Sequence, residues 1–446
     1  MLRFLTKIFC LIFVLAGIQA AAFSLLGPKE VWQNPTIGFY DNDIGGSRNL
    51  GDEYRINSKI VTYAFDPSFL DYFGPNGVKA VDQAIALLNK LPPASRATTN
   101  LVEFLTDDAG RINARAEALN LVDLKAATLS ILLEHMGLSG ERHIFDLRQR
   151  IPTPASCVFN YTTVIRNYDP VTHALTRHVN GSRYTYSIFD TCPGPPGAEA
   201  VEELISDTDF YFTAVASYFD TPFFGKYFIN LTRDDFGGLR YLYSRTNYNF
   251  ESMPTNAFPL PLTGPWAPID IFTNVLGTNT FAVRGGVEKV TYRKTNFDIP
   301  FSTQFRSRVF SYKLPIRTTG GVKSESIRRL LEAPDIIFRA ADIAPPDPAT
   351  IGGVGLLNRQ ANIYVDNPDP DNGPGVIIPQ TVITFSKIGP FYLNFTPFFL
   401  DEATAIRGFS WGSFDGSTND PIVYPQGTTI DDLEDLMFGQ TSFDSK

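Results

Sequence analysis

The stretch Leu124–Leu138, LKAATLSILLEHMGL, is the segment on which the interpretation of the fold depends most. We expect it to form a helix that ends at Met136-Gly137-Leu138. Its middle is filled with residues that belong in a protein core, among them Leu132 and Leu133. The pattern therefore predicts a core helix in the first half of the chain.

Two other segments of the first half carry clear local signals. Ile60–Phe65 (IVTYAF) predicts a strand, and Val78–Leu91 predicts an amphipathic helix that begins near Gly74-Pro75-Asn76-Gly77. Leu231–Ser244 predicts a further helix. Thr232 and Asp235 fit a capping box at its start, in which a hydroxyl and a carboxylate satisfy free backbone N–H groups.

Three segments, in their order along the chain, resemble the metzincin proteases, in particular the matrixin-like group. They are Val61–Leu88, the helix that ends at Met136-Gly137-Leu138, and Leu231–Tyr243. The matching positions are Thr62, Tyr63, Phe65, Asp66, Ala80, Val81, Ala84, Ile85, Met136, Gly137, Leu138, Asp234, Asp235, Gly238, Leu239, Leu242 and Tyr243. The resemblance implies a metzincin-like α+β domain. The chain as a whole is also similar to exported bacterial proteins of uncharacterised function.

The zinc motif of that family is missing. A metzincin helix carries His-Glu-x-x-His, because two His at i and i+4 share one face and can both reach a zinc ion. The corresponding positions here, 130–134, read Ser-Ile-Leu-Leu-Glu, and the position of the third ligand holds Gly140. No Met lies between Met136 and Met253, so the Met-turn is absent as well. No catalytic residue of the family can be carried over.

The first residues have the pattern of a secretory signal. Arg3 and Lys7 are basic, Ile8–Ile18 is an apolar run, and Ala20-Ala21-Ala22 resembles a cleavage site. We therefore expect residues 1–22 to be a signal peptide and the protein to be secreted, extracellular or periplasmic. No later stretch has the roughly 18 apolar residues that a membrane span needs, so we expect no transmembrane segment after removal of the signal.

Length and composition favour two domains of the α+β class. About 425 residues would remain after the signal, enough for two cores. We expect the metzincin-like domain at 23–250, a Pro-rich linker at 251–268 and a mostly-β domain at 269–446. In this second domain, Ser324–Leu331 and Thr429–Met437 are predicted to be helical.

The charge of the mature chain argues against nucleic acid as a partner. Without Arg3 and Lys7, 36 Lys and Arg stand against 47 Asp and Glu, a formal charge of −11. An acidic protein repels a phosphate backbone.

Cys157 and Cys192 are expected to form a disulfide, because they are an even pair in a protein expected to be exported. Val158–Tyr168 and Arg183–Thr191 read as two strands that would form a hairpin with both Cys at its open end. The bond would close a loop of about 35 residues and contribute roughly 3–4 kcal/mol.

Two groups of residues are candidates for metal binding. His135 and His143, with Glu134 and Glu141 near them, could supply two imidazoles and a carboxylate. Their spacing is not i, i+4, and the alternative is that these His are surface or core residues without a metal. The Asp-rich stretch that contains Asp366, Asp369 and Asp371 offers oxygen ligands for calcium but lacks the EF-hand pattern, so a polar turn is the alternative.

Trp411 and Asp415 lie in WGSFDGSTND, which could stack on a sugar ring and bond its hydroxyls. The alternative is a plain hairpin turn at Asp415-Gly416.

These observations favour a non-catalytic, pseudo-protease-like extracellular protein that binds a protein or a glycan or has a structural role. We expect no zinc and no other cofactor, with calcium left open. A divergent metal-dependent hydrolase or peptidase and a carbohydrate-binding surface protein are the alternatives.

Overall fold

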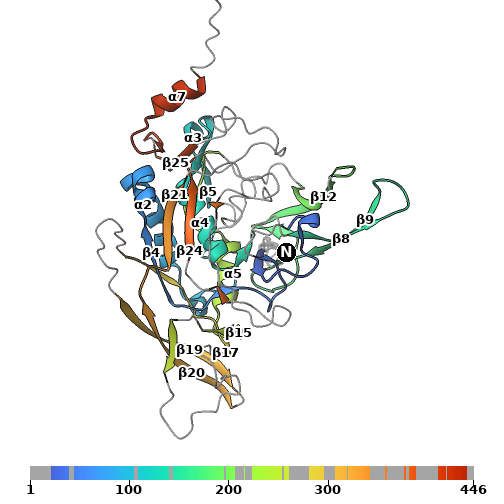
Figure 1. Ribbon diagram of the computed structural model, residues 1–446. Helices are drawn as coiled ribbons and strands as arrows, with labels where there is room; N and C mark the ends of the chain where they lie inside the picture. Colours follow the sequence, from blue (N-terminus) through green and yellow to red (C-terminus); the bar gives the residue numbers. More distant parts are fainter. Residues whose placement is uncertain are drawn as a thin grey trace, which may run out of the picture.

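The computed structural model describes residues 22–39, 45–104, 109–139, 144–194, 197–205, 215, 224–253, 256–260, 281–295, 307–318, 320–341, 357–358, 376–377, 381–387, 410–417 and 419–438. These residues form a mixed α and β structure with five α-helices and several separate sheets (Figure 1). None of the helices in these ranges is both long and apolar enough to cross a membrane.

The main sheet of the body is mostly parallel and has the strand order β18-β4-β21-β24-β22. Its strands are β4 (Ile60–Phe65), β18 (Thr291–Lys294), β21 (Ile336–Ala341), β22 (Leu357–Asn358) and β24 (Thr381–Ser386). The predicted strand β4 is confirmed with the expected bounds and pairs in parallel with β18 and β21, whereas β22 is antiparallel. The sheet therefore joins a strand from before residue 250 to strands from after residue 280.

Helix α2 (Pro67–Lys90) follows β4 and begins earlier than predicted. Asp66 caps it, since its carboxylate accepts a hydrogen bond of 3.1 Å from the backbone N–H of Phe69. The stretch in which the sequence predicts the helix to begin contains a kink, where Gly74 has a φ of 58° and Pro75 follows it. One face of α2 packs on the sheet through a cluster of aromatic rings, which are Phe65, Phe69, Phe73, Phe338 and Phe385.

Helix α4 (Leu124–His135) is the predicted core helix, and it is buried on nearly every side. It packs against α2 and follows directly on β6 (Leu121–Asp123). Ile131 is 3% exposed and Leu132 and Leu133 are fully buried. A helix that is apolar all round belongs in a core, as the sequence indicates.

Helix α5 (Arg233–Tyr243) has the predicted capping box. The hydroxyl of Thr232 and the carboxylate of Asp235 each bond the other residue's backbone N–H. The helix packs on β1 (Phe23–Gly27) and β7 (Leu138–Ser139). A Cβ at Gly238 would lie 2.5 Å from the side chain of Leu138, so the close approach of helix and strand requires glycine here.

A second five-stranded sheet is antiparallel, with the order β15-β17-β19-β20-β16. Its strands are β15 (Asn249–Ser252), β16 (Ala257–Leu260), β17 (Phe281–Arg284), β19 (Arg308–Thr318) and β20 (Gly321–Leu331). The prediction of a helix at Ser324–Leu331 is wrong, because this stretch lies within β20. Burial alternates along it, as in a strand with one covered face.

Three buried ion pairs involve this sheet: one joins two of its own strands, and the other two join it to the rest of the body. Arg284 binds Glu325 with both nitrogens of one edge of its guanidinium, at 2.7 and 3.2 Å. Arg329 binds Asp335 at 2.5 Å, and Arg55 binds Glu251. Because both partners of each pair are buried, removing either would leave a charge in the interior, which is strongly destabilising.

The other described elements are shorter. They are η1 (Pro35–Ile37), β2 (Gly46–Ser47), β3 (Arg55–Ile56), η2 (Ala94–Arg96), β5 (Gly110–Ile112), α3 (Ala114–Ala118), β10 (Asn167–Tyr168), β11 (His178–Val179), β14 (Lys226–Phe228), β23 (Val376–Ile377), β25 (Ser410–Ser413), β26 (Ile422–Val423) and α7 (Ile430–Phe438). α7 confirms the predicted C-terminal helix.

Candidate functional site

Two β-hairpins project from the body and form a structure that we call the arm (Figure 1). The first hairpin consists of β8 (Phe145–Pro152) and β9 (Phe159–Ile165). The second consists of β12 (Ser182–Asp190) and β13 (Ala198–Leu204). β8 and β13 lie next to each other.

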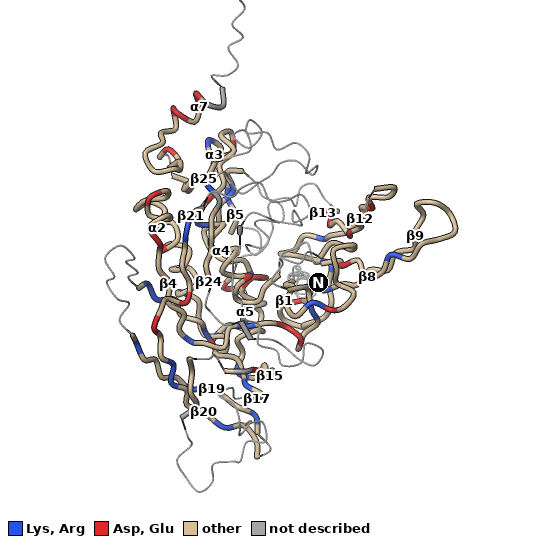
Figure 2. The backbone as a smooth tube through the Cα atoms, in the orientation of Figure 1, with Lys and Arg blue, Asp and Glu red and all other residues tan. Residues whose placement is uncertain are grey.

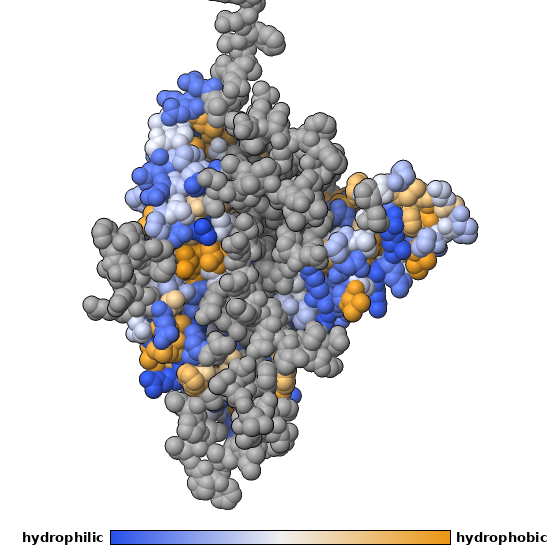
Figure 3. All heavy atoms as spheres, viewed as in Figure 1, coloured by the Kyte–Doolittle hydropathy of each residue, from blue (hydrophilic) through white to orange (hydrophobic). Residues whose placement is uncertain are grey.

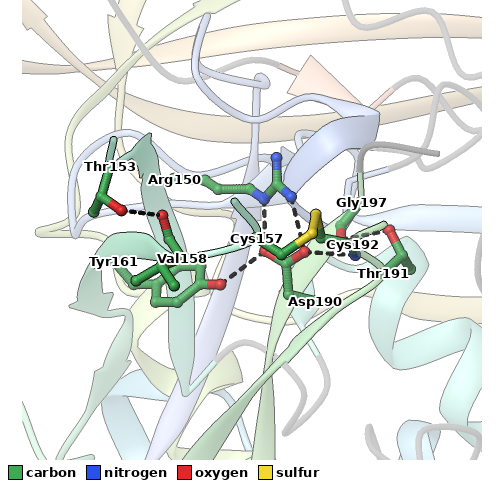
Figure 4. The surroundings of a disulfide bond; sticks show 9 residues. All are labelled: Arg150, Thr153, Cys157, Val158, Tyr161, Asp190, Thr191, Cys192 and Gly197. Carbon is green, nitrogen blue, oxygen red and sulfur yellow. Dashed lines mark hydrogen bonds and ion pairs between the residues drawn. A yellow bond between two sulfur atoms is a disulfide. The ribbon is translucent and has the colours of Figure 1, made fainter. Parts of the chain in front are cut away.

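The Cys157–Cys192 disulfide joins the turns of the two hairpins, with Cα atoms 5.6 Å apart (Figure 4). The predicted pairing of the cysteines is confirmed. The predicted hairpin between Val158–Tyr168 and Arg183–Thr191 is wrong, because β9 pairs with β8 and β12 pairs with β13. Each observed hairpin has a shorter connection than the predicted one, and short connections cost less closure entropy.

An ion pair lies beside the disulfide and joins the same two hairpins (Figure 4). Arg150 on β8 donates to both carboxylate oxygens of Asp190 on β12, at 2.6 and 2.8 Å. The hydroxyl of Tyr161 donates to Asp190 at 2.8 Å, and the guanidinium of Arg150 lies 3.6 Å from the ring centroid of Phe159. The hydrogen bond from Arg150 lowers the pKa of Asp190 from its usual value, so the pair persists in acidic solution.

The arm exposes large apolar side chains along both hairpins. Ile151 is 48% exposed, Val158 51%, Phe189 57% and Val201 38%. Figure 3 shows apolar and charged side chains side by side on this projection. Exposed apolar side chains on a projecting element are candidates for contact with another protein.

The structure describes only part of the predicted His-based metal site. His135 and Glu134 end α4, while Glu141 and His143 lie outside the described residues. His135 is 2% exposed, and its Nε2 lies 3.0 Å from the hydroxyl oxygen of Thr381 on β24. Within the described ranges, no group of three or more His, Cys, Asp or Glu is arranged to hold a metal ion. The calcium candidates Asp366, Asp369 and Asp371 also lie outside those ranges.

Trp411 does not offer a ring for sugar stacking. It is 1% exposed and packs edge-on against Phe73 and Phe385, with centroids 6.2 and 5.5 Å apart. Asp415 forms the expected turn, since its carboxylate accepts a hydrogen bond of 2.8 Å from the backbone of Ser417. The structure thus places Trp411 in the core and leaves only the turn at the surface.

Asp123 is a buried carboxyl group that the sequence analysis did not single out. It ends β6 and caps α4, where it accepts a hydrogen bond of 2.9 Å from the backbone N–H of Ala126. Burial raises its pKa to about 7. An Asp directly before a helix is a known cap signal, but its burial could not be predicted from that signal.

Comparison of the chain with protein-family models, with curated protein sequences and with solved structures gives no match.

Proposed function

We propose that the protein is exported and acts as a non-catalytic binding protein, with a metzincin-like body as the scaffold and the arm as the contact surface. The observation that carries this proposal is the exposure of Ile151, Val158, Phe189 and Val201 on a projection that is braced by a disulfide. Exposing apolar side chains costs solubility, so their concentration on one braced element supports a contact role.

The brace makes the arm suitable for binding. A two-stranded hairpin alone is marginally stable in water. The bond between Cys157 and Cys192 and the Arg150–Asp190 pair hold the two hairpins in one arrangement. A surface that is ordered before binding loses less conformational entropy when a partner docks.

Helix α4 supports the non-catalytic part of the proposal. At the positions where a metzincin carries its first ligand and its base, this chain has Ser130 and Ile131, which are 2% and 3% exposed. These side chains contribute to the core rather than lining an accessible cavity.

The proposal can be tested by binding of the labelled protein to intact cells of the source organism, read by flow cytometry. Phe189→Ser combined with Val201→Ser should lower cell binding about tenfold, because hot-spot contacts are dominated by a few apolar anchors. Val102→Ser combined with Ile422→Ser, two exposed apolar residues away from the arm, is the control and should bind as the unaltered protein does. Equal binding by both variants would contradict the role of the arm.

A further inference from the structure

The antiparallel sheet of β15, β16, β17, β19 and β20 has one covered face and one exposed face. On β19, Tyr312, Leu314 and Ile316 are buried, and the residues between and beside them are exposed or half-buried. The same alternation runs along β20. We call the exposed side the outer sheet face; its exposed side chains are Phe258, Val309, Ser311, Lys313, Arg317, Val322, Ser324 and Arg328.

The charged side chains on the two faces of this sheet differ in whether they form ion pairs. On the covered face, Arg284 and Arg329 are paired with Glu325 and Asp335. The outer sheet face carries no Asp or Glu among its described residues. Its cations Lys313, Arg317 and Arg328 form no ion pair within the described part of the chain, and Arg317 lies over the ring of Tyr248 at 5.0 Å.

This basic face belongs to an acidic protein, whose formal charge is −9 over the whole sequence. Figure 2 shows the Lys and Arg of the lower sheet at the opposite end of the molecule from the Asp and Glu of α7. An unpaired basic surface on an acidic molecule is a local exception and indicates a negatively charged ligand.

The register alternates cations with hydroxyl groups across the face. Ser311 lies opposite Arg328, and Lys313 lies opposite Ser326. Phe258 on the neighbouring strand lies opposite Arg328 and is 56% exposed. Lys313 and Arg317 are four residues apart on β19, about 14 Å at the rise of an antiparallel strand. The cations therefore form a line that suits an extended ligand with repeated charges.

We propose that the outer sheet face binds an acidic polysaccharide whose sugar rings carry carboxylates. The cations would pair with the carboxylates, the serines would exchange hydrogen bonds with the ring hydroxyls, and Phe258 would contact an apolar face of a ring. Nucleic acid fits less well, because successive bases stack on a series of aromatic rings, and Phe258 is the one aromatic ring among the described exposed side chains of this face. The inference goes beyond the proposed role of the arm and does not depend on it.

The test is a titration of a fluorescently labelled polygalacturonate oligomer with the full mature protein, read by anisotropy at low and at physiological salt. Lys313→Ser/Arg317→Ser/Arg328→Ser should weaken binding about tenfold or more, and salt should weaken the binding of the unaltered protein. Lys79→Ser/Lys90→Ser/Arg96→Ser is the matched control, since it removes the same charge from exposed residues that lie on neither the outer sheet face nor the arm, and it should retain full affinity. Circular dichroism would confirm that both variants are folded.

Three results would overturn the proposal. The first is no binding of polygalacturonate by the unaltered protein, and the second is equal loss of binding in the two triple variants. The third is tighter binding of a single-stranded oligonucleotide of equal length than of polygalacturonate. Because Phe189 and Val201 lie on the arm, the cell-binding experiment can fail or succeed independently of this one.

Discussion

Helix α4 and the arm are stabilised by different kinds of interaction. In α4, ten of the twelve residues are buried, and the helix is held by apolar packing against α2 and neighbouring strands. In the arm, strand residues beyond the base are exposed or half-buried, and the hairpins are held by a disulfide and an ion pair. Helix α4 is thus closed to solvent, while the arm presents an extended surface.

This difference bears on where function can lie. A catalytic group must reach a substrate, and in the middle of α4 the side chains contact the core. A binding surface needs exposed apolar area on a rigid support, and the arm has both.

The largest effect is expected when a zinc-binding motif is introduced into α4. Ser130→His/Ile131→Glu/Glu134→His would write His-Glu-x-x-His into the helix, and would place a carboxylate where Ile131 is 3% exposed. A charge buried without a partner, together with disrupted packing, should cost about 5 kcal/mol or more of unfolding free energy. Chemical denaturation with and without zinc measures this loss of unfolding free energy. A stable triple variant that binds one zinc would show that α4 is an accessible site.

Removal of the disulfide should loosen the arm and leave the body intact. Cys157→Ser/Cys192→Ser should reduce the stability of the arm by about 3–4 kcal/mol, because the two hairpins regain freedom when the cross-link is lost. Hydrogen exchange should rise in β8, β9, β12 and β13 and stay unchanged in α4. A uniform rise across both regions would mean that the arm is not a separate unit.

Asp123 makes the capped end of α4 sensitive to pH. Its pKa is raised to about 7 in the folded protein from an ordinary value of 3.8, so the folded state binds the proton more tightly than the unfolded state does. Stability should therefore fall as the pH rises from about 4 to about 7.

Asp123→Asn keeps the cap and removes this titration. Relative to the unaltered protein, it should gain on the order of 2–4 kcal/mol at pH 8 and little at pH 4. Thermal unfolding across this range measures the gain, with Asp431→Asn on the exposed side of α7 as the control. A gain that does not depend on pH would refute the titration of Asp123.

The smallest effect is expected for the ion pair of the arm. Arg150→Met removes an ion pair whose two side chains are both partly exposed, and should cost less stability than any of the changes above. The pKa of Asp190 should then rise toward its ordinary value, which an NMR titration of its carboxyl carbon would detect. An unchanged pKa would mean that Arg150 does not set it.

The sequence predicted elements whose signals are local. Ile60–Phe65 is a strand by alternation and composition, and Thr232 with Asp235 forms the predicted cap. The helix predicted at Ser324–Leu331 rests on the helical spacing of Ile327, Leu330 and Leu331, and it is wrong because this stretch is part of β20. The pairing of β20 with β19, and the buried partners of Arg329, overrode that local pattern.

The candidate site was predictable only in part. Two cysteines in a chain expected to be exported were enough to predict their bond, yet not which strands would pair around it. Which strands pair depends on which connecting loops close first. The ion pair between Arg150 and Asp190 in turn depends on the strand pairing, because it joins β8 to β12. The burial of Trp411 was likewise not visible, because WGSFDG carries the same signals for a surface turn and for a strand that enters the core.

The most direct test of a non-catalytic body is the transition-metal content of purified, chelator-free mature protein, measured by elemental mass spectrometry. His135→Ala/His143→Ala is the control for the candidate ligands on and after α4. We predict less than stoichiometric zinc in both proteins. One zinc per chain that is lost in the control would contradict this account and identify the chain as a metal-dependent hydrolase candidate.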